Sequence, residues 1–86
     1  MNINLYVNDK LTATATDLSV AEVREEAEAM CDELNASVKD ANVDELISRV
    51  DYVDADQPSE RFTIAHAPTD PDDKLFYIIR EMTICI

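Results

Sequence analysis

The fold is decided by residues 19–38, which read SVAEVREEAEAMCDELNASV. Placed about 100° apart, as in an α-helix, these residues separate into an apolar stripe and an acidic arc. The stripe consists of Val20, Val23, Ala27, Met30, Cys31, Leu34 and Val38. The arc consists of Glu22, Glu25, Glu26, Glu28, Asp32 and Glu33, with Arg24 at its edge. The pattern predicts an amphipathic helix from about Val20 to Val38 that packs through its apolar stripe.

Neighbouring residues supply signals for where this helix begins and ends. Ser19 and Glu22 have the spacing of a capping box, in which each side chain bonds to the backbone N–H of the other residue. Leu18 precedes the cap and can pack on Val23 as a hydrophobic staple. We expect the helix to end at Lys39-Asp40-Ala41.

Two short strands are predicted before the helix. Residues 1–7 alternate apolar and polar side chains, and residues 11–16 alternate Leu or Ala with Thr. This period of two is typical of half-buried strands. Asn8-Asp9-Lys10 lies between them, and Asn and Asp tolerate the positive φ angles of a tight turn. The sequence therefore predicts a β-hairpin.

A short second helix is predicted after the long one. Asn42 can cap it, as Ser19 caps the first. The apolar residues that follow at helical spacing are Val43, Leu46, Ile47 and Val50. A strand is expected to begin near Arg49, because Val50, Tyr52 and Val53 favour strands.

Two further strands are predicted in the last third of the chain. Residues 62–66 alternate, and residues 74–86 form the longest strand, with loops at 56–60 and 67–73. Residues 74–86 are apolar on both faces, which is typical of a central strand covered on both sides. The elements predict a single α+β domain over residues 1–86 in the order ββααβββ. We expect a mainly antiparallel sheet of about five strands with the helices on one face.

The chain is strongly acidic. Nineteen Asp and Glu residues against seven Lys and Arg give a net charge of −12, which repels nucleic acid and anionic membranes and favours basic partners. Apolar residues make up 47% of the chain, which is too many for a disordered segment. The sequence shows no apolar run long enough for a membrane span and no signal-peptide pattern, so we expect a cytoplasmic protein.

Residue types that carry catalysis or bind metals form no motif. The chain contains no glycine, which excludes a P-loop and a Rossmann fingerprint. His66 is the only histidine, and we expect it at a strand end on the surface. Cys31 and Cys85 are expected to be buried free thiols, and Asp70-Pro71-Asp72-Asp73 lacks the glycine and the spacing of a calcium loop. We therefore predict a non-enzymatic protein with no metal and no cofactor.

The acidic arc is the strongest signal for a function, because it costs stability. Like charges three or four residues apart each destabilise a helix by about 0.2–0.5 kcal/mol. Such a face is a candidate partner-binding surface that accepts charge-assisted hydrogen bonds from Lys and Arg. The candidate contacts are Glu22, Glu25, Glu26, Glu28, Asp32 and Glu33, with Asp51 and Asp54 as extensions. We expect Asp51 on the opposite strand face from Val50 and Tyr52, and the two acidic surfaces merge if that face borders the helix.

The basic residues are scattered along the sequence, which argues against direct nucleic-acid binding. They are Lys10, Arg24, Lys39, Arg49, Arg61, Lys74 and Arg80.

In size, charge and architecture the whole chain resembles the small acidic proteins that phages and mobile elements use against host defence, such as anti-CRISPR and antirestriction proteins. They share no common motif that can be matched residue by residue. The resemblance implies a stoichiometric inhibitor in the host cytoplasm. Its acidic helix would mimic nucleic-acid phosphates and block a basic groove of a nucleic-acid-binding protein. The alternative is a small acidic structural or regulatory subunit whose charge serves solubility and which can form a homodimer through its C-terminal strand.

Overall fold

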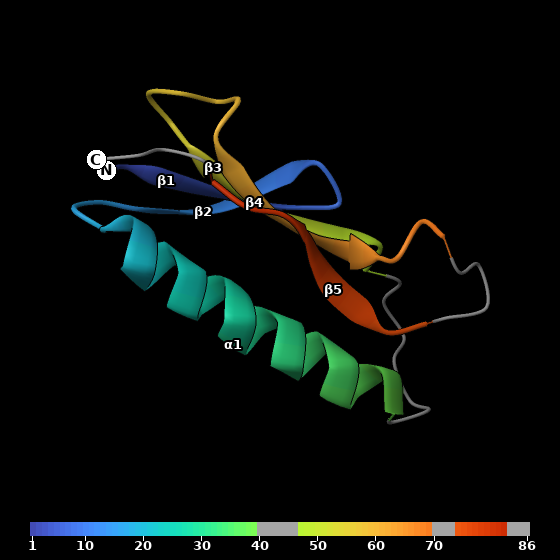
Figure 1. The fold of residues 1–86 in the computed structure, drawn as a ribbon. Helices are drawn as coiled ribbons and strands as arrows, with labels where there is room; N and C mark the ends of the chain where they lie inside the picture. The colour runs from blue at the N-terminus through green and yellow to red at the C-terminus, as the bar shows by residue number, and fades with distance from the viewer. Residues whose placement is uncertain (40–46, 70–73, 83–86) are drawn as a thin grey trace.

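The computed structural model describes residues 1–39, 47–69 and 74–82, and within these ranges the chain forms five strands and one helix. In chain order the elements are β1 (Ile3–Val7), β2 (Lys10–Ala15), α1 (Val20–Lys39), β3 (Arg49–Asp54), β4 (Arg61–His66) and β5 (Phe76–Arg80). The strands form one antiparallel sheet in the order β2-β1-β3-β4-β5. Helix α1 runs diagonally across one face of this sheet (Figure 1). The α+β class and the five-stranded antiparallel sheet are thus confirmed.

The predicted second helix is not confirmed, and neither is the order ββααβββ. Most of that helix falls on residues 40–46, which lie outside the described residues. The described chain resumes at Ile47, and β3 begins at Arg49, where the sequence predicted a strand.

The hairpin of β1 and β2 turns without glycine. Asn8 and Asp9 have φ angles of 51° and 66°, in the left-handed region that tight two-residue hairpin turns require. The Asn8 side-chain oxygen also accepts hydrogen bonds from the backbone N–H groups of Ser48 and Arg49, at 2.8 and 3.2 Å. Asn8 therefore makes the predicted turn and also fastens it to the start of β3.

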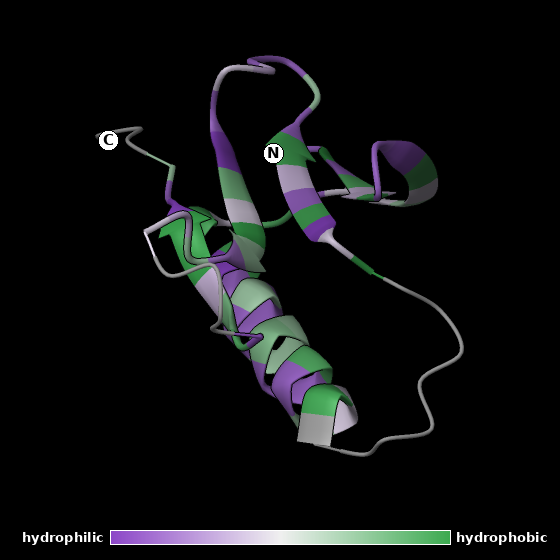
Figure 2. Ribbon diagram, turned by 90° about the vertical axis from the view of Figure 1, so that its right-hand side faces the viewer, coloured by the Kyte–Doolittle hydropathy of each residue, from purple (hydrophilic) through white to green (hydrophobic). Residues whose placement is uncertain are grey.

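Helix α1 begins with the predicted capping box. The Ser19 backbone N–H donates to Glu22 Oε1, and the Glu22 backbone N–H donates to Ser19 Oγ, both at 3.2 Å. The helix runs to Lys39, close to its predicted end, and Figure 2 shows apolar and polar bands alternating along it. Val23 and Ala27 on the apolar stripe are fully buried. No helix among the described residues is long and apolar enough to cross a membrane.

The core lies between α1 and one side of the sheet. Cross-strand partners share a face, so the register of the strands shows which residues face the helix. They include the row Val7–Val50–Ile64–Ile78 and the pair Tyr52–Phe62. All of them belong to the same hydrophobic core as the helix stripe. No described element covers the other side of the sheet (Figure 1).

Strand β5 differs from the prediction of a long central strand. It spans Phe76–Arg80 and lies at one edge of the sheet, whereas β3 is central. Phe76 and Ile78 pack in the core, but Tyr77 and Ile79 remain 41% and 46% exposed. The prediction was wrong because β5 is apolar on both sides although only one side is covered.

Candidate functional site

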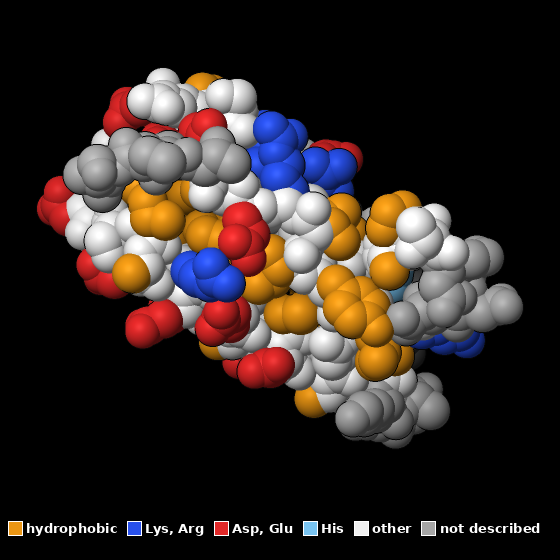
Figure 3. All heavy atoms as spheres, in the orientation of Figure 1, with side chains coloured by type: hydrophobic (Ala, Val, Ile, Leu, Met, Phe, Trp, Pro, Cys, Tyr) orange, Lys and Arg blue, Asp and Glu red, His pale blue; other side chains and the backbone are white. Residues whose placement is uncertain are grey.

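The acidic helix face is the side of α1 turned away from the sheet. Burial of the apolar stripe fixes the rotation of α1 about its axis, so the opposite arc must face solvent. In the space-filling view, acidic side chains gather over the first part of α1 (Figure 3). All six predicted carboxylates of this face are exposed: Glu22, Glu25, Glu26, Glu28, Asp32 and Glu33.

Two carboxylates of the acidic helix face already have partners. Glu28 Oε1 lies 3.2 Å from Arg24 Nε, and Arg24 Nη1 lies 3.2 Å from Glu81 Oε2. Glu22 takes part in the capping box. Within the described ranges, the members of this face that form neither an ion pair nor a capping contact are Glu25, Glu26, Asp32 and Glu33.

The charge of the acidic helix face also acts on the core, through Tyr52. The Tyr52 hydroxyl donates a hydrogen bond to the Glu26 backbone oxygen at 3.5 Å. Burial, followed by the negative charges of Glu26 and Glu33, raises the pKa of Tyr52 to about 12. A phenolate is unfavourable here because it would be both buried and repelled by two carboxylates.

Asp51 and Asp54 do not extend the acidic helix face. Asp51 lies on the opposite side of β3 from Val50 and Tyr52, as predicted, but α1 covers the Val50 side. Asp51 is only 2% exposed and Asp54 only 4%. Asp54 Oδ1 accepts a hydrogen bond from the Asp56 backbone N–H at 2.9 Å, within the turn after β3. The two surfaces therefore do not merge, which corrects the suggested extension.

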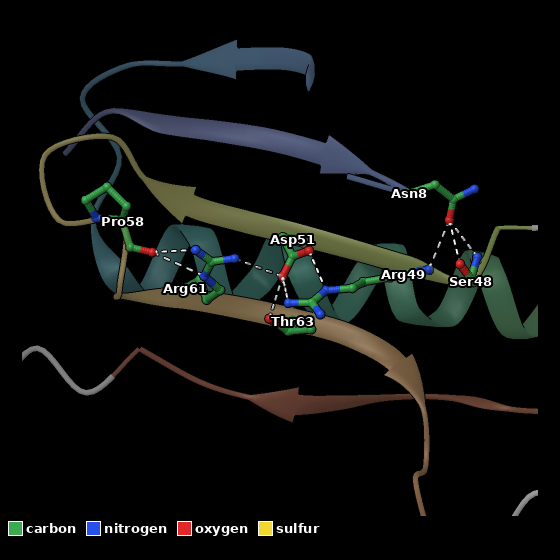
Figure 4. Close-up of polar contacts among 7 residues, drawn as sticks. All are labelled: Asn8, Ser48, Arg49, Asp51, Pro58, Arg61 and Thr63. Carbon is green, nitrogen blue, oxygen red and sulfur yellow. Dashed lines mark hydrogen bonds and ion pairs between the residues drawn. The ribbon is translucent and has the colours of Figure 1, made fainter. Parts of the chain in front are cut away.

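Asp51 is instead the centre of a polar cluster with Arg49, Arg61 and Thr63, the Asp51 cluster (Figure 4). Thr63 Oγ1 donates to Asp51 Oδ1 at 2.6 Å. Arg49 binds both carboxylate oxygens, from Nε to Oδ2 at 2.7 Å and from Nη2 to Oδ1 at 3.1 Å. Arg61 Nη1 lies 3.8 Å from Asp51 Oδ1, while its Nε and Nη2 donate to the Pro58 backbone oxygen. A two-pronged arginine contact of this kind is among the strongest that a carboxylate can make.

The partners of Asp51 outweigh the cost of burying it. Burial by itself raises the pKa of this carboxyl group, whereas the hydrogen bonds from Arg49 and Thr63 and the charges of Arg49 and Arg61 lower it. The net result is a pKa below the ordinary value. Asp51 is therefore ionised in the folded protein at neutral pH.

The Asp51 cluster belongs to the open sheet face, which is the side of the sheet turned away from α1. The central row of this face is Leu11–Tyr6–Asp51–Thr63–Arg80, and it crosses all five strands. The flanking rows are Thr14–Asn4–Val53–Arg61 and Arg49–Ala65–Tyr77. Three arginines that are scattered in sequence thus share one face, where Asp51 is the only carboxylate of the described strands. Sequence reasoning missed this grouping.

Asn35 fastens α1 to the edge strand β5, a role that the sequence did not indicate. Its side-chain Nδ2 donates to the Phe76 backbone oxygen at 3.0 Å, and its Oδ1 accepts from the Phe76 backbone N–H at 2.6 Å. Cys31 is a free, half-buried thiol whose Sγ also donates to the Phe76 oxygen, at 3.2 Å. Burial and then the charge of Asp32 raise the pKa of Cys31, against a hydrogen bond from Asn35.

His66 lies at the end of β4, as predicted, and is half-buried. Its Nδ1 is 3.3 Å from the Leu75 backbone oxygen, and its ring packs on Phe76 with centroids 4.3 Å apart. Among the described residues, no group of three His, Cys, Asp or Glu side chains is placed to hold a metal ion. Cys85 and the segment Asp70-Pro71-Asp72-Asp73 lie outside the described residues.

Comparison with protein-family models, with curated proteins and with solved structures finds no match to this chain. A functional assignment therefore depends on the two faces of the molecule. The acidic helix face offers unpaired carboxylates to a partner, and the open sheet face offers guanidinium groups beside exposed apolar side chains.

Proposed function

We propose that this chain is a non-enzymatic interaction protein whose acidic helix face binds a basic surface of a nucleic-acid-binding protein. More specifically, the chain is an inhibitor of the phage or mobile-element type, anti-CRISPR-like or antirestriction-like, and it acts in the host cytoplasm. Its carboxylates take the place of nucleic-acid phosphates. They block the groove by occupying it, and no reaction is involved.

The exposure of all six carboxylates on one side of α1 is the observation that carries this proposal. Helix residues three or four apart have Cβ atoms about 5–6 Å apart, and phosphates along one DNA strand recur with an axial rise of about 3.4 Å. Because these spacings are comparable, Lys and Arg side chains arranged for phosphates can reach successive carboxylates. Glu25 and Asp32 lie at the centre of the arc and form no ion pair within the described chain, so binding them breaks no internal contact.

The homodimer through β5 receives no comparable support. A strand added to a sheet edge needs the outward-pointing backbone N–H and C=O groups of the edge strand. At Phe76 both of these groups are bound to the Asn35 side chain. We therefore favour the acidic helix face over the edge of the sheet.

The test compares two variants that each remove three carboxylates and change the net charge from −12 to −9. The helix variant carries Glu25→Gln, Glu26→Gln and Asp32→Asn, and it keeps the capping box and the Arg24–Glu28 ion pair. The control variant carries Asp9→Asn, Asp17→Asn and Asp56→Asn, which are exposed positions outside α1. Asn tolerates the positive φ angles of Asp9 and Asp17, so this variant is expected to fold.

The measurement is affinity capture from host lysate, followed by displacement of labelled duplex DNA from each purified captured protein. We expect the wild type and the control variant to displace the DNA and the helix variant to fail, with weaker binding at high salt. Equal displacement by the helix variant and the control variant would show that the acidic helix face does not bind the partner and serves solubility alone. Captured proteins that bind no nucleic acid would exclude phosphate mimicry.

A further inference from the structure

The open sheet face has a composition unlike the rest of this acidic chain. Among the described strand residues of this face, the only carboxylate is buried in the Asp51 cluster, so the exposed charges that these strands place there are guanidinium groups. Exposed apolar side chains lie on both edge strands, with Leu11 52% exposed on β2 and Tyr77 41% exposed on β5. Arginine, tyrosine and apolar residues with few carboxylates are the usual composition of protein–protein interface cores.

Two arginines of this face, Arg49 and Arg80, can bind a further carboxylate without giving up their present partners. A guanidinium group has five N–H donors in a planar fork. Arg49 uses two of its nitrogens for Asp51, and its side chain is 43% exposed. Arg80 uses one nitrogen, which donates to the Ser59 backbone oxygen at 2.9 Å. The remaining donors are suited to a carboxylate from another molecule.

The acidic helix face of the same chain matches this face in charge and in dimensions. Arg49 and Arg80 lie in rows two residues apart, about 6.6 Å along the strands, and on strands two places apart, about 9.6 Å across the sheet, which gives a separation of about 12 Å. Glu25 and Asp32 are seven residues apart on α1, or about 10.5 Å at 1.5 Å per residue. Long side chains bridge the difference. Because α1 already crosses the other side of the sheet diagonally (Figure 1), an identical helix is long enough to cross the open side.

We infer that the open sheet face binds the acidic helix face of a second copy of this chain. Each copy contributes a different surface, so the contact joins copies head to tail. The net charge of −12 on each copy opposes their approach. The contact therefore forms where salt screens this long-range repulsion, as at ~0.15 M, where the Debye length is about 8 Å. The inference does not rest on the proposed function and is tested without any other protein.

The test is complementation between two variants, followed by sedimentation velocity over a range of concentrations. The sheet variant carries Leu11→Gln, Ile79→Gln and Arg80→Gln, all at exposed positions, and keeps the acidic helix face. The helix variant defined above keeps the open sheet face. We expect each variant alone to associate at least about tenfold more weakly than the wild type. An equimolar mixture should form a heterodimer, because one intact surface from each variant completes a single contact.

Three results would overturn the inference. The first is a wild type that stays monomeric up to about 1 mM, the weak end of measurable affinity. The second is self-association of both variants at wild-type strength, which a contact through other surfaces would give. The third is weaker association of the control variant, because its carboxylates lie outside the acidic helix face, and Asp9, whose charge acts on Arg49, would compete with an incoming carboxylate. Circular dichroism checks that each variant is folded, and Arg80→Gln alone should weaken the contact in the same direction.

Discussion

The acidic helix face and the open sheet face place carboxylates in opposite surroundings. On α1, six carboxylates project into water with Arg24 as the nearby cation. On β3, Asp51 is 2% exposed and is bound by two arginines and a threonine. The described strands carry no exposed carboxylate. Although the net charge is −12, the exposed charges that the described strands place on the open sheet face are therefore positive. The same loss of one negative charge should have different consequences on the two faces.

Replacing Asp51 with Ala should have the largest effect. It leaves Arg49 without its two-pronged partner and the Thr63 hydroxyl without its acceptor. We expect the free energy of unfolding, measured by urea denaturation, to fall by about 3 kcal/mol. This is the low end for a broken buried ion pair, because both arginines are partly hydrated. The exposed control Asp56→Ala should change it by less than about 0.5 kcal/mol. Equal losses in the two variants would contradict a special role for the Asp51 cluster.

Replacing Asn35 with Ala should have the next largest effect, because Asn35 joins helix α1 to strand β5. The variant loses both hydrogen bonds to the Phe76 backbone. Each is worth about 1 kcal/mol, so we expect the free energy of unfolding to fall by about 2 kcal/mol. Hydrogen exchange of the Phe76 amide should become faster than in the control Ser37→Ala, which alters an exposed site on the same helix. An unchanged Phe76 exchange rate would show that Asn35 does not protect this edge.

High pH should expose the coupling between the acidic helix face and the core. The pKa of Tyr52 is about 12 in the folded protein against an ordinary value of 10.0. The folded state therefore holds a proton that the unfolded state releases, and the resulting stability is present below pH 10 and lost as the pH rises towards 12. By pH 11 we expect a loss of about 1.4 kcal/mol.

The measurement is the difference in unfolding free energy between the wild type and Tyr52→Phe across this pH range. The variant should lack the alkaline loss that Tyr52 causes. In the variant Glu26→Gln/Glu33→Gln, the pKa of Tyr52, followed by NMR of its ring, should fall but stay above 10.0, because burial is the larger cause. An unchanged pKa of Tyr52 in this double variant would mean that the charges of the acidic helix face do not affect the core.

Local signals in the sequence predicted much of this fold. The apolar stripe and the Ser19–Glu22 capping box placed α1, because helix periodicity and capping depend on residues close together in the chain. Asn8-Asp9 placed the hairpin turn for the same reason. The start of β3 near Arg49 was also predicted correctly, although it follows residues that the structure does not describe.

What the sequence did not show depends on the order of the strands. Alternation along the strand put Asp51 on the opposite side from Val50, but it did not reveal that Thr63 lies across from Asp51. Neither did it reveal that α1 covers the Val50 side and leaves the other open. The unknown strand order also explains the error on β5, since an apolar segment has the same sequence pattern at the centre and at the edge of a sheet. Long-range pairing thus decided which carboxylates became a surface and which became an internal ion pair.

The helix variant, Glu25→Gln/Glu26→Gln/Asp32→Asn, should have the smallest effect, and in the opposite direction. It removes repulsions with carboxylates three or four residues away, each worth about 0.2–0.5 kcal/mol. We expect the free energy of unfolding to rise by about 0.5–1 kcal/mol at low salt and the gain to shrink as salt screens the charges. The control variant has the same net charge, so the difference between the two isolates the local repulsion on α1. A loss of stability in the helix variant alone would mean that these carboxylates support the fold. The α1 carboxylates would then be structural, as Asp51 is, and this would contradict the proposal that they are available to bind a partner.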